Sequence, residues 1–224
     1  MQPFEVRAAG DAALVVQLPE RIDPSLNRWC VALAAAMQRR LGPVLLDAVV
    51  GYCSVTFYFE PLRVETAWLR DEIEGVAEQL DADDGDAPLP AVVDVPVCYG
   101  GAHGPDLADV AAFASCAEED VIARHLAREY RVYLVGFVPG FAYLAEVDPT
   151  IAAPRRATPR PAVPMGSVAI AGGQTGIYPA VTPGGWNIIG RTSLAPYDPS
   201  RREPFLFHPG DRVRFRRVAS LEAN

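Results

Sequence analysis

Lysine is absent from this chain of 224 residues, and all twenty of its basic residues are arginine. This absence excludes a Schiff-base mechanism, a lysine general base and the lysine that holds phosphates in a nucleotide-binding loop. The motifs G-x-S-x-G, H-E-x-x-H and G-x-x-x-x-G-K-[ST] are absent as well. Because no self-contained catalytic motif is present, we expect the isolated chain to be inactive.

Cysteine is scarce, and its spacing argues against a zinc site. No C-x-x-C pair occurs, and no neighbouring histidine completes a set of ligands, so we expect reduced thiols and no metal. The four cysteines are Cys30, Cys53, Cys98 and Cys116.

Long apolar runs are also missing. No run approaches the ~18 residues that a membrane-spanning helix needs. The N-terminal segment carries acidic and basic residues where a secretion signal has an apolar core. The formal net charge is −8, whereas nucleic acids and anionic membranes bind basic surfaces. We therefore predict a cytoplasmic protein that binds a small molecule and other proteins, with neither nucleic acid nor membrane as partner.

The first part of the chain alternates between strand and helix patterns. Asp23 and Pro24 are typical of a helix start, and Gly42 with Pro43 ends that helix. The pattern predicts an α+β domain of order ββαββα over residues 1–85, with two helices on one face of a mainly antiparallel sheet. Its helical stripes place Trp29 and Trp68 in the core. The expected elements are strands at 4–8, 13–18, 44–50 and 54–59 and helices at about 24–41 and 64–80.

A second domain over residues 86–224 follows the acidic, Pro- and Gly-containing segment 81–90, which has no apolar periodicity. Two helical patterns come early, one opened by Pro105 and one by Ser115, which forms a possible capping box with Glu118. The remainder predicts a mostly β domain, because many short strands at this spacing favour a closed barrel. The expected strands are 92–97, 132–138, 167–170, 186–190 and 211–215.

His125 is the candidate acid or base, since imidazole titrates near neutral pH. It also follows Val121 and Ile122 on the apolar stripe of its predicted helix. A hydrogen-bonded core histidine is therefore the alternative to a catalytic one.

Candidate substrate-binding residues gather in the loops rich in Gly and Pro, which hold side chains in fixed places. A guanidinium fork suits a carboxylate or phosphate, and amide and hydroxyl groups suit an amide. Each of these residues has a scaffold role as its alternative. The candidates are Arg160, Gln174, Thr175, Tyr178, Asn187 and Arg191.

Three aromatic residues flank the predicted turn at Pro139 and Gly140, namely Phe137, Phe141 and Tyr143. An aromatic rim beside a rigid turn is typical of a contact surface, so we predict that these residues bind a partner. The alternative is that these aromatic side chains only pack at one end of the barrel.

Several long segments resemble the allophanate hydrolase subunit 1 family, which includes the bacterial 5-oxoprolinase subunit designated B and the Kip-type inhibitor of a histidine kinase. The segments are CYGGAHGPDL, EYRVYLVGF, GFVPGFAYL, ATPRPAVPMGSVAIAGGQTGIYP, TPGGWNIIGRT and PGDRVRF, and they span residues from about 90 to 217. The resemblance implies a cyclophilin-like fold for the second domain and a histidine at position 125 in many relatives.

The function that the resemblance implies is that of a subunit of an ATP-dependent 5-oxoprolinase complex, which opens 5-oxo-L-proline to L-glutamate. Its partners would be a second carboxyltransferase-like subunit and a lactam-hydrolysing subunit. ATP would be bound by the complex and not by this chain alone. Two alternatives stay open: an allophanate hydrolase-type subunit of urea metabolism, and a non-enzymatic Kip-type inhibitor of a histidine kinase.

Overall fold

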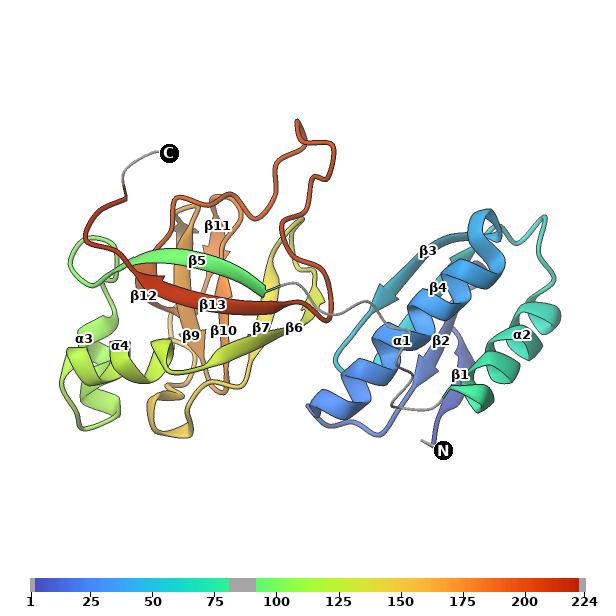
Figure 1. Cartoon of the computed structure of the whole chain (residues 1–224), viewed down its shortest axis with the longest axis horizontal. Helices are drawn as coiled ribbons and strands as arrows, with labels where there is room; N and C mark the ends of the chain where they lie inside the picture. The colour runs from blue at the N-terminus through green and yellow to red at the C-terminus, as the bar shows by residue number, and fades with distance from the viewer. Residues whose placement is uncertain (1–2, 81–91, 222–224) are drawn as a thin grey trace. The chain divides into compact units, whose positions relative to one another are not determined.

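The computed structural model describes residues 3–80 and 92–221. These residues form two compact units, one on each side of residues 81–91 (Figure 1). The domain boundary that the sequence predicts, between residues 85 and 86, lies outside the described residues and stays a prediction.

The first unit has the predicted order ββαββα. Its four strands form an antiparallel sheet of order β1-β2-β4-β3. Alternate strand residues and the apolar stripes of both helices form one core, which contains Leu14, Phe57 and Leu33. The elements are β1 (Glu5–Ala8), β2 (Ala13–Gln17), α1 (Pro24–Leu41), the 3-10 turn η1 (Gly42–Val44), β3 (Leu45–Val50), β4 (Ser54–Phe59) and α2 (Thr66–Gln79).

Helix α1 begins as the sequence predicts, because the Asp23 carboxylate accepts a hydrogen bond from the Ser25 backbone N–H at 2.8 Å. Trp29 of this helix is buried, as expected. The prediction for Trp68 was wrong, since its side chain in α2 is 41% exposed. Successive helical residues point about 100° apart, and α2 buries Leu69 instead.

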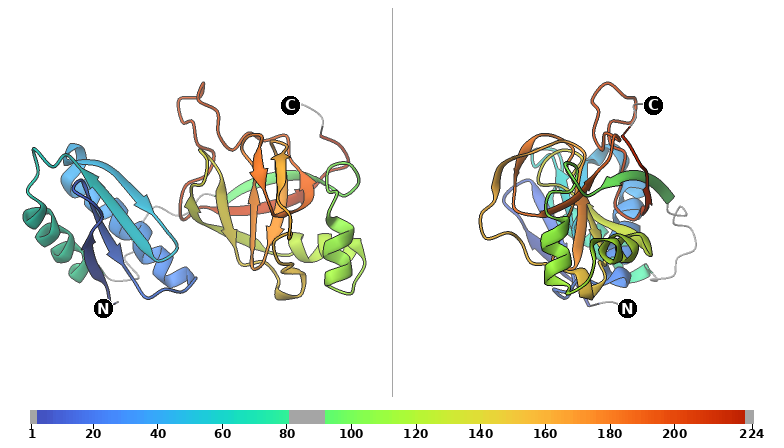
Figure 2. Two further views of the ribbon diagram at one scale, coloured as in Figure 1. Left: turned by 180° about the vertical axis from the view of Figure 1, so that it is seen from behind. Right: turned by 90° about the vertical axis from the view of Figure 1, so that its left-hand side faces the viewer.

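The second unit is a closed barrel of strand order β10-β7-β6-β13-β5-β12-β9, and Figure 2 shows it from behind. Strands β5 and β13 run parallel, and the other neighbours are antiparallel. Helices α3 and α4 contribute to its main core. The elements are β5 (Val92–Tyr99), α3 (Leu107–Phe113), α4 (Glu118–Leu126), β6 (Glu129–Val135), β7 (Ala142–Ala145), η2 (Pro149–Ile151), β8 (Arg160–Val163), β9 (Ser167–Ala171), β10 (Gln174–Ile177), β11 (Thr182–Gly184), β12 (Asn187–Arg191) and β13 (Arg212–Arg217).

Strand β9 is buried on both of its faces. Val168 and Ile170 belong to the main core, whereas the alternate residues Ala169 and Ala171 belong to a second apolar cluster. Because alternate strand residues point to opposite faces of a sheet, this second cluster lies on the outer face of the barrel. Its large members are Phe141, Tyr178 and Trp186, and Val163 of the β8–β11 ribbon joins it.

Two local predictions for this unit were wrong. The segment around Gln174 forms strand β10, paired with β7 and β9, and is not a loop. Ser115 does not open a helix, since its φ is 50°. Helix α4 begins at Glu118, and the Ala117 backbone N–H donates to the Asp120 carboxylate at 3.1 Å. Within the described residues, no helix is long and apolar enough to cross a membrane.

Candidate anion-binding site

The buried carboxylate of Asp106 organises one side of the barrel unit. It is 1% exposed and accepts hydrogen bonds from both terminal nitrogens of Arg160, at 2.7 and 2.8 Å. It also accepts from Arg156 at 2.6 Å and from the backbone N–H of Ile188 at 2.7 Å. A buried carboxylate that accepts from two guanidinium groups holds both of them in place. Asp106 was not among the candidate residues that the sequence indicated.

The segment from Ala153 to Arg156 is fixed to the barrel by its backbone. The Ala153 carbonyl accepts from the Gly172 N–H at 2.7 Å, and the Arg156 N–H donates to the Gly185 carbonyl at 2.8 Å. Asn187 of β12 donates its side-chain amide to the Pro154 carbonyl at 2.8 Å. These three bonds hold the backbone on both sides of Arg155.

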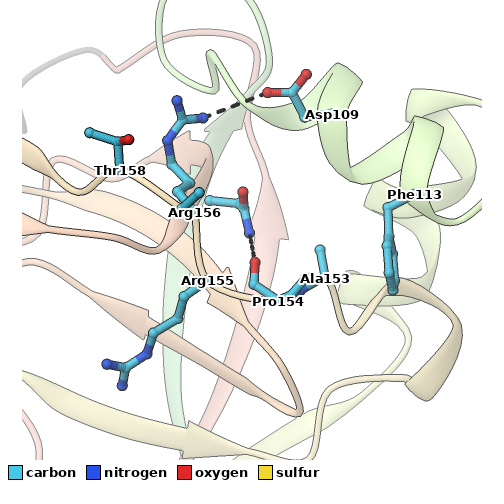
Figure 3. Close-up of a pocket in the computed structure, with 9 residues that line it drawn as sticks. Asp109, Phe113, Ala153, Pro154, Arg155, Arg156 and Thr158 are labelled. Atoms are coloured by element: carbon cyan, nitrogen blue, oxygen red, sulfur yellow. Dashed lines mark hydrogen bonds and ion pairs between the residues drawn. The ribbon is translucent and has the colours of Figure 1, made fainter.

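A pocket of about 430 Å³ opens between this segment and α3 (Figure 3). This volume lies within the range of ~300 to 1,000 Å³ that is usual for small-molecule sites. The pocket has apolar walls beside charged groups. Its lining comprises Asp109, Phe113, Ala153, Pro154, Arg155, Arg156, Ala157, Thr158 and Asn187.

Arg155 and Arg156 leave the segment in different directions (Figure 3). Arg156 extends toward Asp109, at 3.6 Å, in addition to its bond with Asp106. The guanidinium of Arg155 lies 5.9 Å from the centre of the Trp186 ring, a distance at which a cation and an aromatic face attract each other. Arg155 has no ion pair with any residue that the structure describes.

His125 lies in the main core, fully buried, with both ring nitrogens engaged. Nδ1 is 2.8 Å from the Tyr99 hydroxyl, and Nε2 is 3.0 Å from the Thr175 hydroxyl. Thr175 donates its single hydroxyl proton to the Ala169 carbonyl, at 3.0 Å, so it accepts from Nε2. Nδ1 then accepts from Tyr99, and burial lowers the pKa of His125 to about 3. This is the hydrogen-bonded core histidine that the sequence left as an alternative.

The predicted substrate-binding residues do not share one exposed site. Thr175, Tyr178 and Asn187 are buried. Both terminal nitrogens of Arg160 are bonded to Asp106, and the Nε–H of Arg191 donates to the Met165 carbonyl at 3.0 Å. Gln174 is partly exposed at the start of β10. Of the six candidates, Asn187 alone lines the pocket. Their roles in binding stay predictions.

The three rim residues also differ in exposure. Phe137 is 64% exposed, at a left-handed φ of 71°. Tyr143 is partly exposed, whereas Phe141 is 2% exposed and packs edge-on against Tyr178 and Trp186. We expected Phe141 on an exposed rim. Its ring is buried instead, because it completes the outer cluster of the barrel. Partner binding by these residues stays a prediction.

Arg155 and Arg156 were not among the candidate residues that the sequence indicated. Their only signal in the sequence was the concentration of arginine in the Pro-rich segment before β8. Among the described residues, no group of three or more His, Cys, Asp or Glu side chains is placed to hold a metal ion.

The profile of the carboxyltransferase domain, subdomain C and D, matches residues 4–207. The chain belongs to this family, which confirms the resemblance seen in the sequence.

Three curated relatives are similar to the chain over nearly its whole length, and each is named as the 5-oxoprolinase subunit designated B. The protein of Bacillus subtilis is 37% identical, with 98% of this chain and 95% of the relative covered. That of Escherichia coli O157:H7 is 40% identical, with 96% of each chain covered. That of Haemophilus influenzae is 37% identical over 92% of this chain.

Solved structures are also similar to this chain. TTHA0988 is 41% identical, with a TM-score of 0.82 over 96% of this chain. This chain spans 40% of the length of that chain. PH0987 of Pyrococcus horikoshii is 36% identical, with 96% of this chain and 97% of that chain covered and a TM-score of 0.56. The urea amidolyase of K. lactis, 19% identical with a TM-score of 0.77 over 97% of this chain and 15% of that chain, shows the shared fold alone.

Proposed function

We propose that this chain is a subunit of an ATP-dependent 5-oxoprolinase complex that converts 5-oxo-L-proline to L-glutamate. The observation that carries the proposal is the common name of the three curated relatives, the 5-oxoprolinase subunit designated B, at 37 to 40% identity over 92 to 98% of this chain. The partners in this proposal are a carboxyltransferase-like subunit and a lactam-hydrolysing subunit.

The chemistry requires activation of a stable amide. Transfer of a phosphoryl group from ATP to the lactam carbonyl oxygen would make the ring carbon more electrophilic. Water then attacks that carbon, the ring C–N bond breaks and the nitrogen takes up a proton, which leaves an acyl phosphate. A second water hydrolyses the acyl phosphate to the carboxylate and inorganic phosphate. ATP would be held by the complex, because this chain has no lysine and no phosphate-binding loop. The chain would contribute a binding surface and would not contribute the nucleophile.

The test is reconstitution from purified subunits, with release of L-glutamate and of ADP as the two measurements. We expect turnover with all subunits present, and background release when this chain is omitted or is present alone. Allophanate, tested in parallel, distinguishes the urea-metabolism alternative. Undiminished turnover without this chain, or robust turnover by this chain alone, would contradict the proposal.

A further inference from the structure

We propose that Phe137, Tyr143 and Arg155 form a docking surface for a second polypeptide on the outer face of the barrel. These three side chains are called the outer patch below. The partner is a protein with an apolar surface that covers the two rings and a carboxylate that pairs with the arginine. Identifying this partner as the carboxyltransferase-like subunit rests on the proposed function, whereas the surface itself rests on the geometry of the barrel unit.

The outer patch stands on a buried aromatic base, formed by Phe141 and Trp186, which are 2% and 5% exposed. Phe137 meets Phe141 edge-on, with ring centroids 5.8 Å apart. The Tyr143 ring lies 4.8 Å from that of Phe141 and 5.8 Å from that of Trp186. The Arg155 guanidinium lies 5.9 Å from the centre of the Trp186 ring. These contacts join the three side chains into one continuous surface.

The backbone at Phe137 holds an apolar ring out in solvent. Its φ of 71° lies in the left-handed region, which a bulky residue rarely adopts. The turn is closed by the Gly136 N–H, which donates to the Phe141 carbonyl at 3.0 Å. The ring of Phe137 is nevertheless 64% exposed, so this conformation does not serve to bury it. Strained backbone of this kind is typical of functional sites, and the exposed ring fits contact with another molecule.

Arg155 adds an unpaired cation to this surface. Figure 3 shows its side chain extending away from Asp109 and Phe113. Burial raises the pKa of the Tyr143 phenol, and the nearby charge of Arg155 partly offsets this effect. Arg155 forms no ion pair within the described part of the chain. Its planar fork of donors is therefore left for a carboxylate that another molecule supplies.

The composition of the outer patch is that of an interface hot spot, where aromatic residues and arginine are enriched. Side chains that are already held by packing lose less conformational entropy on binding. The alternative is that these residues only pack the barrel. It applies to Phe141 and Trp186, which are buried, but it does not account for the exposed ring of Phe137.

The comparisons favour a polypeptide as the occupant. Each of the three curated relatives is named as a subunit. In TTHA0988, the counterpart of this chain shares one polypeptide with a larger remainder, since this chain spans 40% of that length. A separate chain needs an interface to hold the neighbour that a covalent link keeps close. The chain has a formal charge of −8, so an unpaired arginine on its surface would fix the position of an acidic residue of the partner.

The test measures binding of the purified full-length chain to the purified carboxyltransferase-like subunit by calorimetry. Phe137→Ala should weaken binding by about tenfold or more, because it removes an apolar contact, and Arg155→Gln should do so because it removes the ion pair. Raising the NaCl concentration from about 50 to about 500 mM screens that ion pair. It should therefore weaken binding of the unaltered chain more than binding of Arg155→Gln.

The matched controls are Leu62→Ala and Arg63→Gln, in the loop between β4 and α2. Leu62 is 94% exposed and Arg63 is exposed, so these changes remove the same kinds of group from another part of the chain. Both controls should bind the subunit as the unaltered chain does. Thermal unfolding of the two outer-patch variants should match that of the unaltered chain, so that a loss of binding is not a loss of folding.

Three results would overturn the proposal: unaltered binding by Phe137→Ala or by Arg155→Gln, no binding by the unaltered chain, or a dimer of this chain alone that Phe137→Ala dissociates. The last result would make a second copy the occupant, and size-exclusion chromatography detects it.

Turnover by the reconstituted complex separates this inference from the proposed function. Binding that depends on the outer patch, without any turnover of 5-oxo-L-proline, would leave the docking surface in place and remove the proposed function. Normal binding and normal turnover with both outer-patch variants would do the opposite.

Discussion

The buried imidazole of His125 is held in its neutral form by its neighbours. Its ring packs on Phe215 and Tyr130, with ring centroids 4.5 and 5.2 Å apart, and both nitrogens are bonded to hydroxyl groups. Protonation would put a charge among apolar side chains and would break the bond that Nδ1 accepts from Tyr99. The side chain is therefore unsuited to exchanging protons with a substrate near neutral pH.

This arrangement predicts how stability depends on pH. The pKa of His125 is about 3 in the folded chain and ~6.5 when unfolded, so the unfolded chain binds more protons between these values. The free energy of unfolding should fall as pH falls from about 6.5 toward 3, by at most ~1.4 kcal/mol per pH unit from this group. Urea unfolding of the unaltered chain and of His125→Gln between pH 8 and 5 measures the difference. If the free energy of unfolding of His125→Gln depended on pH as that of the unaltered chain does, the assignment of this pH dependence to His125 would be contradicted.

Asp106 shows why the candidate site was only partly predictable at the level of residues. Its partners lie 50, 54 and 82 positions away in the sequence, at Arg156, Arg160 and Ile188. No local pattern in the sequence indicates which arginine pairs with a carboxylate so far away in the chain. The ion pair between Arg160 and Asp106 was therefore not predicted, and the role of Arg160 in substrate binding stays a prediction.

At the level of elements, the predicted helices and the longer strands were recovered because their apolar periodicity is local. Strands β7, β8, β10 and β11 were missed. Strand β10 contains Gly176, where a Cβ atom would lie 3.1 Å from both Phe141 and Trp186, so a larger residue there would crowd the packing on the barrel's outer face. Glycine lowers strand propensity, and pairing with β7 and β9 overrides it. Such non-local pairing is not visible in a single sequence.

The turn between β6 and β7 provides a prediction at this scale. Phe141→Ala should lower the free energy of unfolding by ~3 to 5 kcal/mol, because the ring is buried between Tyr178 and Trp186. Phe137→Ala, in the same turn, is the matched control, and its exposed ring should change stability by only about 0.5 kcal/mol or less. Chemical denaturation of both variants measures the two changes in the free energy of unfolding. Equal effects would show that Phe141 is not part of the barrel's packed outer cluster.

At the scale of the whole molecule, each unit has a hydrophobic core of its own. One cluster draws its buried residues from the interval between Val6 and Ala77, and the other two draw theirs from between Val95 and Phe215. The sequence predicted this division, because the apolar periodicity is interrupted by the segment 81–90. It did not predict that β5, the first strand after that segment, would lie between β12 and β13 in a closed barrel.

The position of β5 determines where the chain can be divided. A fragment of residues 92–224 keeps all seven barrel strands, so we expect β-rich circular dichroism and one cooperative unfolding transition. A fragment of residues 104–224 lacks β5, which opens the barrel and leaves β12 and β13 with unpaired edges. It should be unfolded or aggregated. A fragment of residues 1–80 should fold as the α+β unit. If the fragment 92–224 were unfolded under conditions in which the full chain is folded, the barrel would need the first unit for its stability.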